Sequence, residues 1–149
     1  MMLLFLLPVS LGFADLFEVG EGKEYPDLES AVARAMRGDT IVVYAGEYVS
    51  DDTMTIYSKH WLDIVAFEGA TLICTDPSKP VIEVIRSDNI EIEGFRFEHR
   101  TENTCGAFNA LVSNCYFITM HDNEFEYCDT GVKIYDGRFI TLSNNIIAN

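Results

Sequence analysis

The chain repeats one apolar pattern four times, and this repetition limits the folds it can adopt more than any other feature does. Each copy consists of two pairs of apolar residues in i, i+2 spacing, and the second pair begins eight residues after the first. Successive copies begin 28, 28 and 22 residues apart, at positions 54, 82, 110 and 132. The pairs are Met54 and Ile56 with Leu62 and Ile64, Ile82 and Val84 with Ile90 and Ile92, Ala110 and Val112 with Ile118 and Met120, and Val132 and Ile134 with Ile140 and Leu142.

A two-residue period is typical of a strand with one buried face. A repeat of about 20 to 30 residues built from such strands indicates a solenoid. One coil cannot bury its own apolar face, so neighbouring coils must stack to enclose a core. The repeat therefore predicts an all-β solenoid, a right-handed parallel β-helix in which Ile90, Ile118 and Ile140 lie over one another.

One α-helix is predicted ahead of the strands, from Pro26 to Arg37. Pro26 suits a first helical turn, and Gly38 tolerates the left-handed conformation that ends many helices. We expect this helix to cap the open N-terminal end of the stack. Thr40–Tyr44 should form the first coil strand, and Gly46–Tyr48 its turn. The apolar stripe of the helix comprises Leu28, Ala31, Val32, Ala35 and Met36.

A third row follows five residues after the start of each second pair. Asn123 and Asn145 occupy matching positions in it, where stacked amides can bond to one another and to turn backbone. Two unrelated turn asparagines are the alternative. The residues of this row are Phe67, Phe95, Asn123 and Asn145, and the inward residues two positions later are Phe97, Phe125 and Ile147.

The first fourteen residues, Met1–Ala14, carry no charged side chain. An apolar centre at Leu3–Leu7 and small residues at Gly12 and Ala14 predict an export signal that is too short to span a bilayer. A buried N-terminal strand or an internal start is the alternative. The expected organisation is a signal peptide over 1–14 and one β-helix domain over 15–149, the N-terminal portion of a longer protein. Export would place the protein outside the cell, on its surface or in a periplasm.

The formal net charge is −14. This charge argues against nucleic acid and against docking on anionic lipid, since both require clustered Lys and Arg. It is compatible with divalent cations, with basic partners, or with an acidic surface that is simply solvated. After removal of the signal, no membrane insertion is expected.

Four cysteines are present in a chain that is predicted to be exported. No CxxC spacing occurs, so a cysteine zinc site is not indicated. Cys105 and Cys128 should lie close together on adjacent coils, about 5 Å apart along the stack, and are the candidate disulfide pair. Buried free thiols are the alternative. The other two cysteines are Cys74 and Cys115.

Several stretches resemble right-handed parallel β-helix proteins of the pectin lyase-like superfamily. YPDLESAVARAMRGDTIVVYAGEY is similar to the N-terminal cap and first coil of that superfamily, and RFITLSNNIIAN, NIEIEGFRFEH and FITMHDNEFEYC are similar to its repeats. The resemblance implies an exported module that engages carbohydrate, as part of a polysaccharide-active protein. A non-catalytic structural or adhesive surface protein is the alternative. An enzyme of this kind would be a polysaccharide lyase or a glycoside hydrolase. Such lyases pair a calcium-binding cluster of acids with a basic residue, and such hydrolases use a cluster of aspartates on neighbouring coils. Neither motif is found as a string in this sequence.

If the repeat register is right, the residues between the inward pairs face outward. Carboxylates on adjacent coils then stand about 5 Å apart, which suits a shared Ca²⁺ or mutually raised pKa values. Glu93 and Asp122 are the candidate metal ligands, and an ordinary polar face is the alternative. No nucleotide or redox cofactor motif is present. The candidate functional positions are Glu91, Glu93, His121, Asp122 and Lys133.

Basic and aromatic side chains provide two further sets of candidates. Arg96, Arg100, Lys133 and Arg138 could clamp a substrate carboxylate or act as a lyase base, or they could pair with nearby acids. Aromatic rings near coil edges could stack on sugars or fill turns and core. These aromatic residues are Trp61, Tyr116, Tyr127 and Tyr135.

Overall fold

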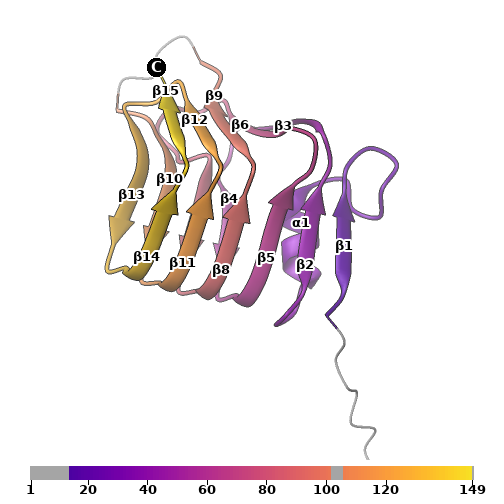
Figure 1. Cartoon of the computed structure of the whole chain (residues 1–149). Helices are drawn as coiled ribbons and strands as arrows, with labels where there is room; N and C mark the ends of the chain where they lie inside the picture. Colours follow the sequence, from indigo (N-terminus) through magenta and orange to yellow (C-terminus); the bar gives the residue numbers. More distant parts are fainter. Residues whose placement is uncertain (1–13, 102–105, 149) are drawn as a thin grey trace, which may run out of the picture.

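The computed structural model describes residues 14–101 and 106–148, over which the chain forms a parallel β-helix of about five turns with one short helix (Figure 1). Three sheets run along the stack, and neighbouring strands in each are parallel. The six-stranded sheet contains β1 (Leu16–Val19), β2 (Thr40–Val43), β5 (His60–Ala66), β8 (Asp88–Glu93), β11 (Tyr116–His121) and β14 (Arg138–Ser143). The five-stranded sheet contains β3 (Gly46–Ser50), β6 (Ala70–Cys74), β9 (Arg96–His99), β12 (Glu124–Glu126) and β15 (Ile146–Ala148). The four-stranded sheet contains β4 (Met54–Tyr57), β7 (Ile82–Ile85), β10 (Phe108–Ser113) and β13 (Thr130–Tyr135).

Each coil visits the three sheets in turn, so that β5, β6 and β7 form one coil and β8, β9 and β10 form the next. In Figure 1 the chain rises along the six-stranded sheet at the front, descends along the four-stranded sheet behind it, and moves to the left with each coil. Coiling in this sense is right-handed. The predicted fold class is therefore confirmed.

The inward rows align as the repeat predicts. Ile118 pairs with Ile90 on one side and with Ile140 on the other. Ile90 and Ile118 are buried. The offsets of 28, 28 and 22 residues recur as strand register, since Met54 pairs with Ile82 and Ala110 pairs with both Ile82 and Val132. Stacking each coil on the next removes these side chains from water, which is the main stabilising term of the fold.

The helix α1 (Leu28–Arg34) lies beside β4, β1 and β2 at the N-terminal end of the stack. Asp27 caps it, because its Oδ1 accepts a hydrogen bond of 2.7 Å from the backbone N–H of Ser30. The helix thus covers β4, the edge strand of the four-stranded sheet, and caps the N-terminal end of the stack as predicted. Its buried residues are Leu28, Ala31 and Val32.

The helix is shorter than the predicted span from Pro26 to Arg37, and Met36 is 77% exposed instead of lying on the apolar stripe. The Asp39 carboxylate accepts a 2.7 Å hydrogen bond from the Met36 N–H. Lys59 Nζ donates a 2.8 Å bond to the carbonyl oxygen of Ala35. Groups outside the helix therefore satisfy its last polar atoms, and the chain leaves the helical path three residues before Gly38.

Two strands differ from the prediction. β1 was not expected, and it pairs in parallel with β2, the predicted first coil strand. Gly46–Tyr48 was predicted as a turn but belongs to β3, which pairs with β6 along its whole length. β3 is largely exposed, and an exposed strand needs no buried apolar row. Its sequence therefore lacks the apolar alternation that indicates a strand.

The predicted inward stack forms in the five-stranded sheet. Phe97 and Phe125 are paired in register and fully buried, and their ring centroids are 5.2 Å apart. Ile147 pairs with Phe125 as predicted but is 63% exposed, because it lies in the last described coil. Aromatic stacking along the axis therefore fills this corner of the core.

One coil departs from the repeat. β5 and β8 are offset by 28 residues, whereas Leu72 of β6 pairs with Phe97 of β9 at an offset of 25. The turn after β5 is therefore three residues longer than its counterpart after β8. Phe67 lies in this turn and is 47% exposed, so the prediction that it aligns with Phe95 is wrong.

The predicted asparagine ladder is present. Asn123 is buried, and its Nδ2 donates to the carbonyl oxygen of Ile92 at 3.0 Å and to Oδ1 of Asn145 at 3.2 Å. Its own Oδ1 accepts from the N–H of Phe95 at 3.0 Å. Asn145 repeats the arrangement one coil later by donating to the carbonyl oxygen of Met120 at 2.8 Å. The two amides thus satisfy backbone groups near the ends of β8 and β11 and in the turn that follows β8.

Cys74, Cys115 and Cys128 are buried and form no disulfide with one another, and burial raises the pKa of each thiol. Cys105 lies outside the described residues, and the predicted pair of Cys105 with Cys128 lies outside them too. Residues 1–13 of the predicted export signal are likewise outside the description. Within the described ranges, no helix is long and apolar enough to cross a membrane.

Candidate functional site

The outer face of the six-stranded sheet carries two rows of side chains, each with one residue from each of β5, β8, β11 and β14. Residues at i and i+2 of a strand point to the same face, and parallel pairing aligns them along the stack. This alignment brings together acids and a histidine that lie 28 to 30 positions apart in the chain. The first row is Asp63, Glu91, Thr119 and Thr141, and the second is Val65, Glu93, His121 and Ser143.

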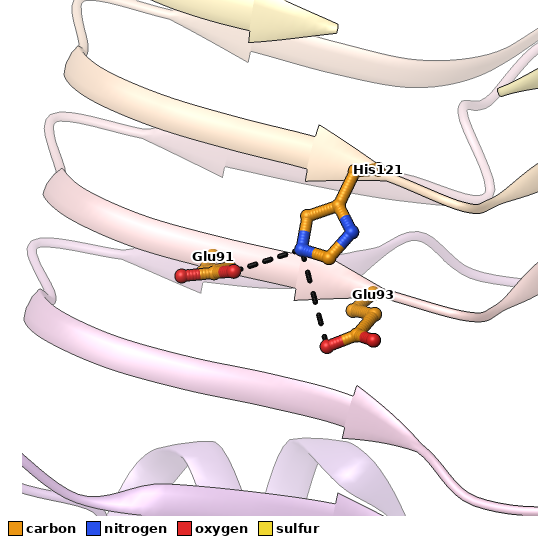
Figure 2. A group of neighbouring side chains, drawn as sticks. All are labelled: Glu91, Glu93 and His121. Atoms are coloured by element: carbon orange, nitrogen blue, oxygen red, sulfur yellow. Dashed lines mark hydrogen bonds and ion pairs between the residues drawn. The ribbon is translucent and has the colours of Figure 1, made fainter. Parts of the chain in front are cut away.

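Glu91, Glu93 and His121 converge at the centre of this face (Figure 2). His121 Nε2 lies 2.8 Å from Glu91 Oε1 and 3.9 Å from Glu93 Oε2. One ligand atom from each of the three side chains lies within 4.8 Å of the others. Both glutamates are on β8 and the histidine is on β11, so a single strand pairing sets their separation.

Asp122 contacts the opposite edge of the same imidazole. Its Oδ2 lies 2.6 Å from His121 Nδ1, and its backbone has φ +55°. The pKa of His121 is raised, first by the hydrogen bond to Asp122 and then by that to Glu91, because both carboxylates stabilise the imidazolium. The predicted metal ligands were Glu93 and Asp122, whereas the geometry groups Glu93 with Glu91 and His121 and leaves Asp122 behind the ring.

Lys133, also predicted on this face, lies elsewhere. It belongs to β13 of the four-stranded sheet, and its Nζ is 4.4 Å from the centroid of the Phe108 ring. It therefore does not join the group formed by Glu91 and His121. Among the predicted site residues, four share one face and Lys133 does not.

The other basic candidates are held by neighbours. Arg96 contacts Glu124 at 3.0 Å, and Arg100 contacts Glu47 at 2.9 Å, so these arginines follow the alternative of pairing with acids. Arg138 is different, because its guanidinium lies 5.9 Å from the ring centroid of Tyr116 on the six-stranded sheet. The face thus presents an arginine and a tyrosine beside the polar rows.

The same sheet has an aromatic corner, and the aromatic candidates from the sequence included Trp61 but not Phe117 or Phe139. Trp61, Phe117 and Phe139 recur at the repeat spacing, each directly before an inward residue, and each has a left-handed backbone with φ of 54°, 53° and 58°. They are 49%, 52% and 68% exposed. The rings of Phe117 and Phe139 stack at 4.7 Å with an angle of 5° between their planes. Asn89 occupies the same row with φ +53°.

The other predicted aromatic residues are divided among different corners. Tyr116 is 46% exposed and precedes Phe117 on β11, so it extends the aromatic corner. Tyr127 follows β12, and Tyr135 ends β13, so neither lies on the six-stranded sheet. Aromatic and polar candidates therefore meet on one sheet, although two tyrosines lie apart from it.

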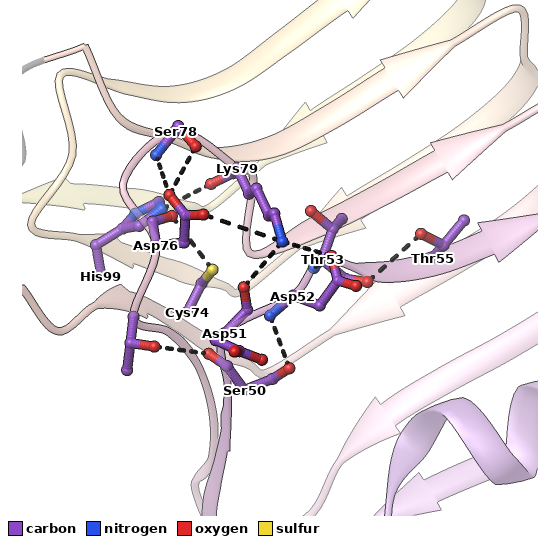
Figure 3. Close-up of polar contacts among 11 residues, drawn as sticks. Ser50, Asp51, Asp52, Thr53, Thr55, Cys74, Asp76, Ser78, Lys79 and His99 are labelled. Carbon is purple, nitrogen blue, oxygen red and sulfur yellow. Dashed lines mark hydrogen bonds and ion pairs between the residues drawn. The ribbon is translucent and has the colours of Figure 1, made fainter.

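A second acid-rich group lies at the turns that follow β3 and β6 (Figure 3). Lys79 Nζ is 3.1 Å from Asp52 Oδ1 and 3.9 Å from Asp76 Oδ2, and it donates to the carbonyl oxygen of Asp51 at 3.1 Å. An ammonium group already occupies the position between these carboxylates. We interpret these ion pairs and the hydrogen bond of Lys79 as structural contacts that hold the turns after β3 and β6 together.

Comparison of the chain with protein-family models, with curated proteins and with solved structures finds no significant match. The parallel β-helix therefore rests on the structure itself, and membership of the pectin lyase-like superfamily stays an expectation. The outer face of the six-stranded sheet carries the residues that bear on function. This face combines a three-residue group with metal-ligand chemistry, rows of hydroxyl groups and an exposed aromatic corner.

Proposed function

We propose that this protein is an exported β-helix module that binds carbohydrate along the outer face of its six-stranded sheet, as part of a polysaccharide-active protein. The observation that carries the proposal is the aromatic corner of Trp61, Phe117 and Phe139, where large exposed rings occupy left-handed backbone positions. The proposal concerns binding, because exposed rings can hold a sugar without any chemical step.

The folded backbone alone does not explain these rings. A left-handed conformation costs a non-glycine residue about 1–2 kcal/mol, and Asn tolerates it better than aromatic residues do. Asn89 shows that the corner accepts such a residue. Exposed aromatic residues at positions that favour Asn conflict locally with the fold, and such conflicts concentrate at functional sites. Flat apolar rings suit the C–H faces of sugar rings.

The rows beside the corner supply polar partners in a matching direction. Thr119, Thr141 and Ser143 offer hydroxyl groups on neighbouring coils, and His121 offers a ring nitrogen. Coils are spaced about 4.8 Å apart, so an extended glycan lying along the axis would meet one residue of each row at every coil that it crosses. The net charge of −14 disfavours direct contact with a polyuronate and favours a neutral glycan, or an acidic one bridged by a cation.

The test replaces Phe117 and Phe139 by Asn, singly and together. Titration calorimetry against a panel of neutral glycans and polyuronates, with and without divalent cation, measures affinity. We expect at least a tenfold loss in the variants, equal to about 1.4 kcal/mol. Relief of the backbone offsets the lost ring stacking, so each variant should keep the free energy of unfolding within about 1 kcal/mol.

Tyr127 provides the matched control, since it is 52% exposed with φ +50° but lies on another corner. Tyr127→Asn should leave affinity unchanged. Absence of binding across the panel, or an equal loss in Tyr127→Asn, would favour the structural or adhesive alternative. Export is tested separately, by the N-terminus of protein recovered from a secreting host: it should begin at Asp15.

A further inference from the structure

We propose that Glu91, Glu93 and His121 form a binding site for a divalent transition metal of the Zn²⁺ class. The site differs in composition from the Ca²⁺ site expected from the sequence, and it does not depend on the carbohydrate proposal. It is tested with metal alone, in the absence of any sugar.

The spacing of the three ligand atoms suits a small ion. A tetrahedral site with bonds of about 2.0–2.1 Å places its ligand atoms about 3.3 Å apart. His121 Nε2 lies 2.8 Å from Glu91 Oε1 and 3.9 Å from Glu93 Oε2, on either side of that value. Both glutamate side chains are substantially exposed, so rotation about their bonds can bring both distances to this value while β8 and β11 stay paired.

The chemistry of the ligands selects the metal. Ca²⁺ prefers six to eight oxygen ligands, whereas one imidazole nitrogen with two carboxylates is a set that Zn²⁺ and its neighbours bind. Because the group includes His121 Nε2, it is more than a patch of acids. Three protein ligands leave a fourth position open toward solvent, where water or another oxygen ligand can bind.

Two neighbouring features support this assignment. Asp122 Oδ2, 2.6 Å from His121 Nδ1, orients the ring and leaves Nε2 directed at the two glutamates. Metal-binding histidines commonly have such a carboxylate partner. Within the described part of the chain, no Lys or Arg forms an ion pair with Glu91 or Glu93, in contrast to the acids around Lys79. The charge of these two glutamates is therefore available to a cation.

The test measures Zn²⁺ binding to the tag-free protein by titration calorimetry, and Co²⁺ binding by visible absorption. We expect one equivalent to bind saturably, without the ultraviolet charge-transfer band that thiolate ligands give. His121→Gln and Glu93→Gln should each weaken binding at least tenfold. Asp122→Asn should weaken it less, since it removes only the charge of the partner that orients the ring.

His60→Gln is the matched control, because His60 is an exposed histidine of the same sheet that contacts a single acid, Asp88. It should bind Zn²⁺ as the wild type does. Circular dichroism melts of each variant establish that it is folded. No saturable binding in the wild type, undiminished binding in His121→Gln, an equal loss in His60→Gln, or a thiolate band would each overturn the assignment.

Discussion

Asn123→Ala should destabilise the protein by about 3 kcal/mol, although the change removes only one small polar side chain. Asn123 is 1% exposed, and its amide satisfies the Phe95 N–H and the Ile92 carbonyl in a fully buried environment. Each buried backbone group left without a partner costs about 1–3 kcal/mol, so two such groups and the lost contact to Asn145 lead to this value. For a chain of this length the loss corresponds to a fall in melting temperature of roughly 10 °C.

Asn145→Ala is the matched control on the next coil. Asn145 makes the same kind of contacts, to the Asn123 N–H and the Met120 carbonyl, but its side chain is only partly buried. Water can replace those bonds, so the cost should stay near 1 kcal/mol. The contrast between the two variants isolates burial, because the chemical change is identical.

Urea unfolding followed by circular dichroism measures both costs, and hydrogen exchange of the Phe95 amide examines one bond directly. In Asn123→Ala this amide should exchange faster, whereas in Asn145→Ala it should stay protected. The reasoning fails if the two variants are equally destabilised, or if the Phe95 amide keeps its protection when Asn123 is removed. Equal costs would mean that burial does not set the size of the effect, and a protected Phe95 amide would mean that Asn123 is not the group that protects it.

Two further predictions concern the histidines. His99 is buried, with Nδ1 2.8 Å from Asn109 Oδ1 and Nε2 2.9 Å from the Lys79 carbonyl oxygen, and a neutral imidazole donates to one of these two oxygens (Figure 3). His99→Phe leaves that oxygen without its donor and should cost about 1–3 kcal/mol in urea unfolding; a stability equal to that of the wild type would contradict this role. Asp122 raises the pKa of His121 above the ordinary 6.5, so the stabilisation from His121 is fully present below pH 6.5 and is lost as pH rises through the higher folded-state pKa. The melting temperature difference between wild type and His121→Gln should therefore shrink as pH increases, and a difference that grows would contradict the assignment.

The repeating part of the fold could be predicted from sequence because each buried row needs one apolar residue per coil. Ile90, Ile118 and Ile140 recur for that reason, and the ladder of Asn123 and Asn145 follows from the same alignment. The elements at the N-terminal end do not repeat. α1 ends early because Asp39, outside the helix, binds a backbone N–H that a longer helix would have used. Such contacts depend on tertiary structure and leave no periodic signal.

The candidate site was predicted in part for the same reason. Alternation places Glu91, Glu93 and His121 on one outer face, which the sequence analysis identified. It did not predict that Asp122 would lie behind the imidazole, because a left-handed residue at the end of β11 breaks the alternation there. Lys133 was grouped with them by coil, but it belongs to another sheet. A coil has three faces, and the repeat alone does not assign a residue to one of them.

A solenoid allows each row to be compared with itself, and this comparison separates the proposed sites from the scaffold. In the second outer row, Val65 and Ser143 flank Glu93 and His121, so in this row the ligand residues occupy two adjacent coils. In the aromatic corner, Asn89 is the one residue that suits its backbone. Coils contact mainly their neighbours, so a change on the outer face should act locally. The metal group and the aromatic corner can therefore be removed independently while the inward rows stay intact.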